Sequence, residues 1–337
     1  MLFNPDESKN LKMKIGLTFD LRETYLNLGY SEDETAELDK EETIVGIEQA
    51  IETLGHKTIR IGNLFDLQKR LLSGERWDLV FNICEGMHGI GREGQVPSIL
   101  DAYQIPYTFS DPLVLSLTLH KGLTKRVLRD AGIATADFYI VQNVNDVYAM
   151  HLPFPVFVKP IAEGSGKGID GRSIVNDKSR LLEVCGRLLK DYNQEVLVES
   201  FLNGREFTVG IAGTGEDAIC VGVMEVKIDS EVEEQAYSRF IKENYDGRVH
   251  YSSISGSLFD ACAKICLDAW RVLGCRDAGR VDIRFDDKGN PFVIEVNPLP
   301  GLNYIHSDLP ILMYKKGFAY IDLIGMILHS ASKRIVT

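Results

Sequence analysis

The chain has 337 residues, 45% of them hydrophobic and 26% charged, with a formal net charge of −12 at pH 7. This composition suits a globular protein of two or three domains, and the acidic balance argues against a nucleic-acid or anionic-membrane partner, although a local basic pocket could still bind phosphates. With no signal-peptide core, no membrane-spanning apolar run and six cysteines without a C-x-x-C pair, we expect a cytoplasmic protein with reduced, mostly buried thiols.

The first 115 residues predict an α/β domain. The expected elements are apolar strands at 14–19, 56–62 and 77–84, helices between them, and a further helix and short strand within 92–111. The first helix should stop at Gly55, since glycine readily ends a helix. The alternation of strands and helices implies a parallel sheet.

The remaining chain predicts two more units, at 116–202 and 203–337. The first should contain a basic amphipathic helix at 119–133, a strand at 155–160, a glycine-rich turn at 161–169, a helix at 179–192 and a strand at 195–202. The second should contain antiparallel strands from 204 onward, a helix at 258–274 and a hairpin at 279–298. We therefore expect an α/β protein of three consecutive domains, with an α+β C-terminal part.

The predicted hairpin, GRVDIRFDDKGNPFVIEVNP, is charged on one face. Its apolar positions are Val281, Ile283 and Phe285 on one strand and Phe292, Ile294 and Val296 on the other. Pairing these two sets puts Asp282 opposite Glu295 and Arg280 opposite Asn297, roughly 5 Å apart. Two facing carboxylates favour a cation between them, and oxygen ligands suit Mg²⁺. The alternative is a solvated network in which Arg280 and Arg284 neutralise the acids.

The turn KPIAEGSGKGI carries Gly164, Gly166 and Gly168 at every second position. Glycines let a loop bring its amides against phosphate oxygens. The turn is neither a Walker motif nor a Rossmann fingerprint, and an ordinary hairpin is the alternative. Lys159 ends the strand directly before the turn, which favours phosphate binding, and Lys121 is a second candidate.

Three further polar residues stand at positions that suit ligand binding. Glu199 and Glu206 flank SFLNGR after a strand, where they could contact an adenine amino group and ribose hydroxyls, or be ordinary surface acids. His88 follows the strand at 77–84 in a glycine-rich loop, and such loops commonly bind ligands. A structural or exposed histidine is the alternative.

Five blocks in order resemble the ATP-grasp superfamily and, within it, the D-alanine–D-alanine ligases, over nearly the whole chain. They are HGIGREGQ with IPYTFS, LHKGLTKRVLRDAGI, PVFVKPIAEGSGKGI, VLVESFLNGREFTV and GRVDIRF…FVIEVNPLPGL. The resemblance implies an ATP-grasp fold with ATP between the central and C-terminal domains. It implies an ATP-dependent ligase that joins small amino acids through an acyl phosphate, in cell-wall biogenesis, as a cytoplasmic homodimer.

By position, the resemblance also implies site residues. ATP would contact Lys121, Lys159, Glu163, Gly164, Ser165, Gly166, Glu199, Leu202, Glu206 and Asn297. Two Mg²⁺ ions, replaceable by Mn²⁺, would bind Asp282, Glu295 and Asn297. The catalytic residues would be Arg280, Ser165, Lys242 and Gly301, and the amino-acid substrates would contact Glu23, His88, Arg280, Leu302 and Ser307. In this assignment Arg280 and the Gly301 amide face the developing oxyanion.

The amino-acid half departs from the family pattern. The family's G-G-x-S-x-E loop is replaced by LTFDLRETYLNLGY, where Glu23 is the candidate acid. The motif H-G-x-x-G-E-D-G becomes HGIGREGQ, with Arg92 before Glu93, and the tyrosine of a family Lys-Tyr pair is absent after Lys242. An apparent insertion in NYIHSDLP leaves Ser307 or His306 as the carboxylate-binding residue.

These departures leave three hypotheses. The chain is a D-alanine–D-alanine ligase with a diverged pocket, a ligase for another amino-acid pair or a biosynthetic intermediate, or a nucleotide-binding regulatory module without catalysis. Retention of Arg280, both metal acids and Asn297 speaks against the third. Because the changes gather around the amino-acid pocket, we predict that D-alanine is not the best substrate.

Overall fold

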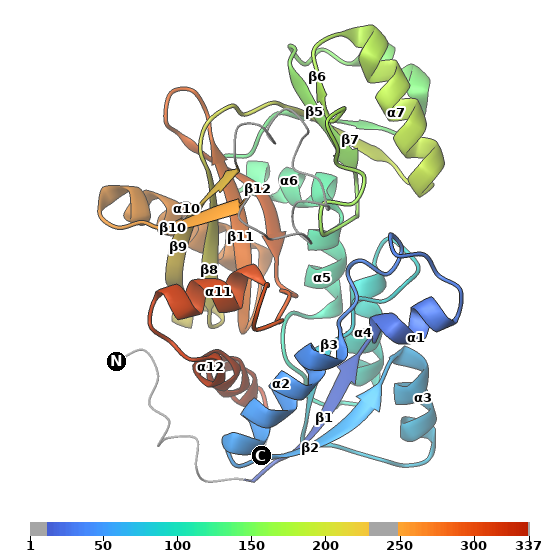
Figure 1. Cartoon of the computed structure of the whole chain (residues 1–337), viewed down its shortest axis with the longest axis vertical. Coiled ribbons are helices and arrows are strands. Elements are labelled where there is room, and N and C mark those ends of the chain that lie inside the picture. The colour runs from blue at the N-terminus through green and yellow to red at the C-terminus, as the bar shows by residue number, and fades with distance from the viewer. Residues whose placement is uncertain (1–11, 229–248, 336–337) are drawn as a thin grey trace.

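The computed structural model describes residues 12–228 and 249–335 of the chain. The strands within these ranges form three sheets, which Figure 1 shows at the bottom, at the top and on the left. The predicted mixed α/β class is confirmed. We keep the domain limits 1–115, 116–202 and 203–337 as a proposal. No helix of the described ranges is both long and apolar enough to cross a membrane.

The N-terminal sheet is parallel, as predicted, with strand order β2-β1-β3. Its strands are β1 (Lys14–Phe19), β2 (Lys57–Gly62) and β3 (Leu79–Ile83). Its helices are α1 (Arg22–Asn27), α2 (Glu41–Thr53), α3 (Leu64–Leu72), the 3₁₀ helix η1 (Arg92–Gly94) and α4 (Gln95–Ala102). Every residue of β3 is buried, which suits a parallel strand covered on both faces.

The central unit is an antiparallel sheet with strand order β4-β7-β5-β6, covered by one long helix. Its strands are β4 (Phe138–Val141), β5 (Val156–Pro160), β6 (Ile174–Val175) and β7 (Val196–Ser200). Its helices are α5 (Pro112–Leu119), α6 (Lys121–Asp130), the 3₁₀ helix η2 (Val144–Ala149) and α7 (Lys178–Tyr192). Leu181, Val184 and Leu188 of α7 pack on Val156 and Val158 of β5.

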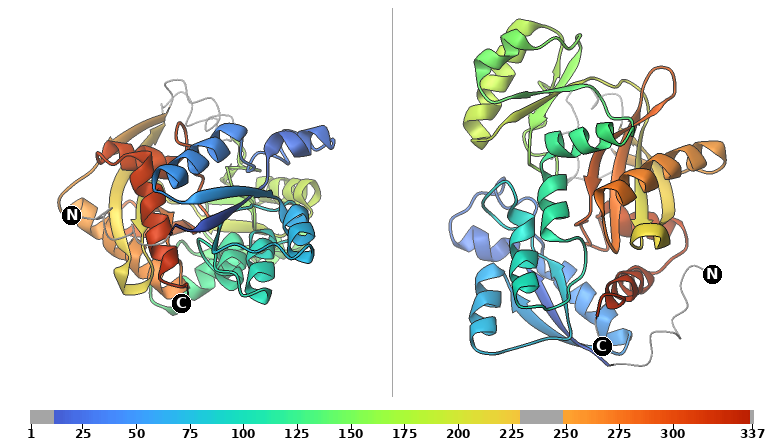
Figure 2. Two further views of the ribbon diagram at one scale, coloured as in Figure 1. Left: turned by 90° about the horizontal axis from the view of Figure 1, so that it is seen from below. Right: turned by 180° about the vertical axis from the view of Figure 1, so that it is seen from behind.

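The C-terminal sheet is antiparallel, with strand order β10-β9-β8-β11-β12. Its strands are β8 (Glu206–Ala212), β9 (Ile219–Ile228), β10 (Val249–Ser253), β11 (Ala278–Phe285) and β12 (Pro291–Asn297). Its helices are the 3₁₀ helix η3 (Gly215–Asp217), α10 (Ser257–Leu273), α11 (Asp308–Lys315) and α12 (Tyr320–Ser332). Helix α10 covers one face of this sheet (Figure 2, right), with Cys266 and Trp270 in a core shared with Val281.

The last helix, α12, packs the C-terminal unit against the N-terminal unit. Figure 1 shows α12 beside α2, and Leu323 and Ile327 share an apolar cluster with Ile44 and Ile47. This packing fixes the C-terminal sheet relative to the N-terminal one, since side chains of both close a single buried core.

The hairpin of β11 and β12 has the predicted pairing at its charged end. Asp282 lies opposite Glu295, and Arg280 lies opposite Asn297. The four side chains therefore lie on one face, because the two pairs are separated by two residues on each strand.

Farther along, the predicted register is wrong because a β-bulge intervenes. The pairing shifts after Asp282, so that Ile283 lies opposite Val293 instead of Ile294. A bulge sets two residues of one strand against one of the other and turns the following side chains over. Val293 is therefore buried in the core, whereas Phe292 and Ile294, which were expected there, are half-buried.

Candidate active site

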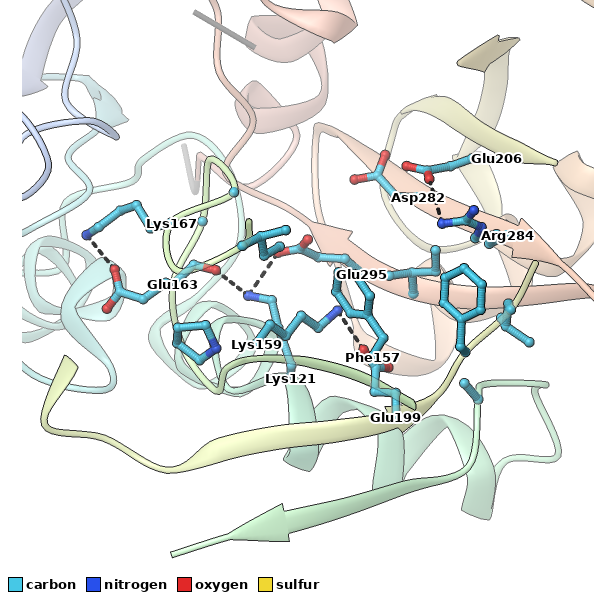
Figure 3. A pocket seen from close by; sticks show the side chains of 18 of the residues that line it. Lys121, Phe157, Lys159, Glu163, Lys167, Glu199, Glu206, Asp282, Arg284 and Glu295 are labelled. Atoms are coloured by element: carbon cyan, nitrogen blue, oxygen red, sulfur yellow. Dashed lines mark hydrogen bonds and ion pairs between the residues drawn. The ribbon is translucent and has the colours of Figure 1, made fainter. Parts of the chain in front are cut away.

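A pocket lies between the central and C-terminal sheets, under the glycine-rich loop. It encloses about 970 Å³ including its open mouth. Its walls come from β5, β7, β11 and β12, and its polar lining residues include Lys121, Lys159, Glu163, Ser165, Lys167, Glu199, Glu206, Arg280, Asp282, Arg284 and Glu295. Figure 3 shows many of these side chains around the space. The mixed polar and apolar lining suits a small-molecule ligand.

Two lysines hold a buried carboxylate on one wall of this pocket. Lys159 Nζ lies 2.8 Å from Glu199 Oε2, and Lys125 contacts the other carboxylate oxygen. Burial would raise the pKa of Glu199, but the two lysines lower it to about 2. Burial likewise opposes the charge of Lys159, yet Glu199 and Glu295 raise its pKa overall. Lys159 is therefore a fixed cation that faces the pocket.

A second cation lies beside the first. Lys121 Nζ is 3.1 Å from Glu295 Oε1 and donates to the carbonyl oxygen of Glu163. Figure 3 shows the amino groups of Lys121 and Lys159 close together, directed to Glu295 and Glu199. Burial acts to raise the pKa of Glu295, but Lys121, Lys159 and Arg280 lower it to about 2.

The charged face of the hairpin forms the opposite wall. Asp282 accepts hydrogen bonds from Thr208 Oγ1 at 2.8 Å and from Asn297 Nδ2 at 3.2 Å. Arg280 Nη1 lies 3.2 Å from Asp282 Oδ2 and 2.6 Å from Asp308 Oδ2. Each acid of the facing pair, Asp282 and Glu295, is thus next to a protein cation. Carboxylate and amide oxygens of this kind are what Mg²⁺ prefers.

The glycine-rich loop requires glycines because its backbone adopts left-handed φ angles. Ser165, Gly166 and Gly168 have φ values of +50°, +72° and +74°, in the left-handed region that favours glycine. A Cβ on Gly168 would lie 2.5 Å from the Pro160 ring. The loop therefore folds tightly back on β5 and leaves Ser165 exposed at the mouth of the pocket.

A second pocket, of about 630 Å³ with its mouth, adjoins the first. The two share Gly164, Ser165, Arg280 and Glu295. The remaining residues of the second pocket include Glu37, Glu85, Glu93, Asn297 and Gly301. This pocket is acidic, and it meets the first one at Arg280.

Two acids of this second pocket, Glu85 and Glu93, have raised pKa values. Burial raises the pKa of Glu93 to about 8, a shift that Arg92 opposes and Glu37 reinforces. Burial also raises the pKa of Glu85, with Glu93 as the next cause. Strongly perturbed acids in a cleft are typical of binding and catalytic sites, and a cationic ligand group would ionise them.

Most of the predicted site residues come together in these two pockets. Those that line the first are Lys121, Lys159, Glu163, Gly164, Ser165, Gly166, Glu199, Leu202, Glu206, Arg280, Asp282 and Glu295. Asn297 and Gly301 line the second. Ser307 is close by, since a Cβ on Gly301 would lie 2.9 Å from its hydroxyl oxygen. Lys242 lies outside the described residues.

Three predicted substrate residues have other surroundings. Glu23 is exposed on α1 and lines neither pocket. His88 is also exposed, with Nε2 3.1 Å from the hydroxyl of Tyr30. Leu302 is buried, and its carbonyl oxygen accepts a hydrogen bond from Tyr320.

Several lining or supporting residues were not predicted. Lys125 carries a usable signal, because it follows Lys121 by four residues on a basic helix and so shares its face. Glu85 lies two residues after β3, in the loop that carries His88. Glu37 carried no signal in the sequence, and Ile294 was assigned to the wrong face of the hairpin.

This arrangement of sheets, with a lysine-rich pocket under a glycine loop, is the ATP-grasp fold. The chain superposes on a D-alanine–D-alanine ligase of Bacillus anthracis complexed with ATP, with a TM-score of 0.70, 24% identity and coverage of 95% of this chain and 98% of that one. It superposes on the VanG D-Ala:D-Ser ligase of Enterococcus faecalis with a TM-score of 0.72, 20% identity and coverage of 95% and 100%.

Sequence comparison identifies the family within that class. The family model described as D-ala D-ala ligase C-terminus matches residues 127–329. A D-alanine–D-alanine ligase of Pelobacter propionicus is 33% identical over 258 residues, which are 74% of this chain and 79% of that protein. The chain belongs to the D-alanine–D-alanine ligase family and is an ATP-dependent ligase.

Proposed function

We propose that the protein joins two small amino acids in an ATP-dependent reaction that spans the two pockets. The observation that carries this proposal is their shared border at Ser165, Arg280 and Glu295. A lysine-lined pocket suits a nucleoside triphosphate, and an acid-lined pocket suits an ammonium group. Their meeting at an arginine suits a carboxylate that receives a phosphoryl group.

ATP is a substrate in this scheme and occupies the first pocket. Lys121 and Lys159 bind its phosphates through charge-assisted hydrogen bonds. The loop around Ser165 folds over the β- and γ-phosphates. Glu199 and the backbone of Leu202 hold adenine, and Glu206 holds ribose. The fold shared with an ATP-bound ligase supports this assignment.

Asp282, Glu295 and Asn297 fit Mg²⁺, because they present oxygen atoms on one face of the hairpin that borders both pockets. These residues would hold two Mg²⁺ ions, and Mn²⁺ suits the same ligands. When bound there, the metal would neutralise negative charge on the phosphate groups. Lys121 and Arg280 lie beside the two acids, and in this proposal they contact phosphate and acyl oxygens.

The reaction follows from these positions. A carboxylate oxygen of the first amino acid attacks the γ-phosphorus, the bond to the β–γ bridging oxygen breaks, and ADP leaves. The amine of the second amino acid then attacks the acyl carbon, loses a proton, and displaces inorganic phosphate. Arg280 and the Gly301 amide stabilise the oxyanion. Lys242, outside the described residues, stays the proposed partner of the γ-phosphate. The other residues contribute chiefly positioning.

For the first amino acid we propose an ammonium site at Glu85 and Glu93, in place of Glu23. These two acids line the second pocket, whereas Glu23 does not. A changed ammonium site changes which amino acid fits, so we propose that D-alanine alone is not the best substrate. D-alanine–D-alanine ligation is the second candidate, because relatives such as the Pelobacter propionicus protein bear that name. The homodimer stays a proposal.

The test is ADP release with purified protein, ATP, Mg²⁺ and a panel of amino acids. We expect release that requires an amino acid and that Asp282→Asn abolishes. Asp287→Asn is the matched control, since Asp287 is exposed in the turn of the same hairpin. Release that needs no amino acid, or that Asp282→Asn leaves unchanged in a folded protein, would contradict the proposal.

A further inference from the structure

Arg92 reaches from the N-terminal unit into the start of the glycine-rich loop. Its Nη1 donates to the carbonyl oxygen of Ala162 at 2.9 Å, and its Nη2 donates to Glu37 Oε2 at 2.8 Å. Nη2 also lies 3.7 Å from Glu163 Oε2. One guanidinium from η1 therefore contacts two successive residues of the loop and one acid of its own unit.

Glu37 completes the contact from the same side. Its Oε1 accepts a hydrogen bond from the backbone amide of Gly164. A Cβ on Gly164 would lie 3.0 Å from that oxygen, so glycine permits the close approach. Glu37, Gly164 and Ser165 all line the acidic pocket, and Gly164 and Ser165 also line the nucleotide pocket. The contact thus lies at the border where the two pockets meet.

The pair is buried and charged. The side chains of Arg92 and Glu37 are 7% and 9% exposed. Burial acts to raise the pKa of Glu37, but Arg92 and Lys167 lower it overall. Burial acts against the charge of Arg92, yet Glu37 and Glu163 raise its pKa. Removing either partner takes from the other buried charge its closest counterpart and leaves only Glu163 or Lys167 to compensate it, which is costly.

We propose that Arg92 and Glu37 form a domain latch, a pair of positioning residues that holds residues 162–164 and thereby sets Ser165 over the reacting groups. The proposal rests on the proposed function only for the contact of the loop with ATP. It also gives a role to Arg92, which directly precedes Glu93 in this chain's version of the family motif. An acid at position 92 would face Glu37 and Glu163, and like charges there would repel the loop.

The first test measures how fast trypsin cleaves the glycine-rich loop in the absence of any ligand. Lys167 and Arg172 are trypsin sites in and after the loop, and local opening exposes them to cleavage. We expect Arg92→Ala to speed cleavage there about tenfold or more, because charge-assisted hydrogen bonds to the loop are lost. Arg180→Ala is the control, since Arg180 forms an exposed pair with Glu183 in the same unit and should leave cleavage unchanged.

The second test separates positioning from mere stability. Arg92→Ala and Glu37→Gln should raise KM for ATP about tenfold or more, and the double variant should do little more than either single one, because both act through one contact. Arg92→Lys keeps the charge but not the forked geometry of the guanidinium, so its KM for ATP should lie between those of wild type and Arg92→Ala. If Arg92→Ala does not fold, Glu37→Gln and Gly164→Ala carry the test.

The outcomes distinguish the two levels of the account. Cleavage of the loop within twofold of wild type in folded Arg92→Ala and Glu37→Gln overturns the latch, even if melting temperature falls. Faster cleavage with unchanged KM for ATP overturns the role of the latch in positioning. If no variant or wild-type protein binds ATP, the proposed function fails while the cleavage test still decides whether the loop is latched.

Discussion

Replacing Glu199 by glutamine should destabilise the protein, because two buried lysine ammonium groups would lose the carboxylate that they share. The carboxylate of Glu199 is 6% exposed and lies between the buried ammonium groups of Lys125 and Lys159. Glutamine has nearly the same shape but no charge. The two lysines would then remain buried without the carboxylate that both contact, and burial already lowers the pKa of Lys125.

The size of the effect follows from the carboxylate pKa, which falls from 4.5 to about 2. Since one pKa unit corresponds to about 1.4 kcal/mol, this stabilisation is about 3 kcal/mol at neutral pH. The loss of one partner of a buried ion pair typically costs about 3–5 kcal/mol, which agrees. The folded-state pKa is the lower one, so the contribution is present above pH 4.5 and is lost as pH falls toward 2.

The assay is urea unfolding at pH 7 without nucleotide, followed by circular dichroism. Glu225→Gln is the matched control, because the Glu225 side chain is also 6% exposed but its partner Arg205 is 54% exposed. We expect a loss of about 3 kcal/mol for Glu199→Gln and about 1 kcal/mol or less for the control. Equal losses in the two variants would refute the reasoning. The difference between wild type and Glu199→Gln should also shrink as pH falls from 4.5.

Lys159→Ala should weaken ATP binding at least tenfold in calorimetry, because a charge-assisted phosphate contact is lost, and an unchanged Kd would remove Lys159 from the phosphate site. Arg334→Ala should cost about 3 kcal/mol in thermal unfolding, because Arg334 binds the fully buried Asp277 through two 2.7 Å contacts. The exposed Lys333 pair is its control, and equal losses for Arg334→Ala and Lys333→Ala would contradict the account. Folded Glu93 keeps its proton to about pH 8 while the unfolded residue loses it near 4.5, so stability should fall as pH rises across this range, and Glu93→Gln should reduce that slope in pH-dependent unfolding. An unaltered slope would contradict the burial of that carboxyl.

The sequence was sufficient for features carried by local pattern. Alternation and turn residues were enough to set Asp282 opposite Glu295, and the confirmed pairing brings both to one pocket wall. The same pattern could not reveal the bulge beyond Asp282, because Phe292, Val293 and Ile294 are all apolar. Which of three consecutive apolar residues faces the core depends on tertiary packing, which periodicity does not contain.

Contacts between segments that are distant in the chain could not be predicted from the sequence pattern. Glu37 meets the amide of Gly164, 127 residues away, through a polar loop with no periodicity. Glu23 is the candidate acid in the segment that replaces the family loop, yet its side chain on α1 is exposed to solvent. In the sequence, Arg92 is only a departure from a family motif. Its role depends on a carbonyl of the glycine-rich loop that only the folded chain brings near.

The most direct test of the central claim is kcat/KM for phosphate release with D-alanine, D-serine, L-amino acids and mixed pairs, with the product identified by mass spectrometry. We predict an ATP-dependent amide product and a value for D-alanine alone that lies about one to two decades below the best pair, because unpaired polar groups in the changed pocket reduce the rate. The highest value for D-alanine, with D-alanyl-D-alanine as product, would contradict the substrate assignment. No amide product with any pair would contradict the proposed reaction itself.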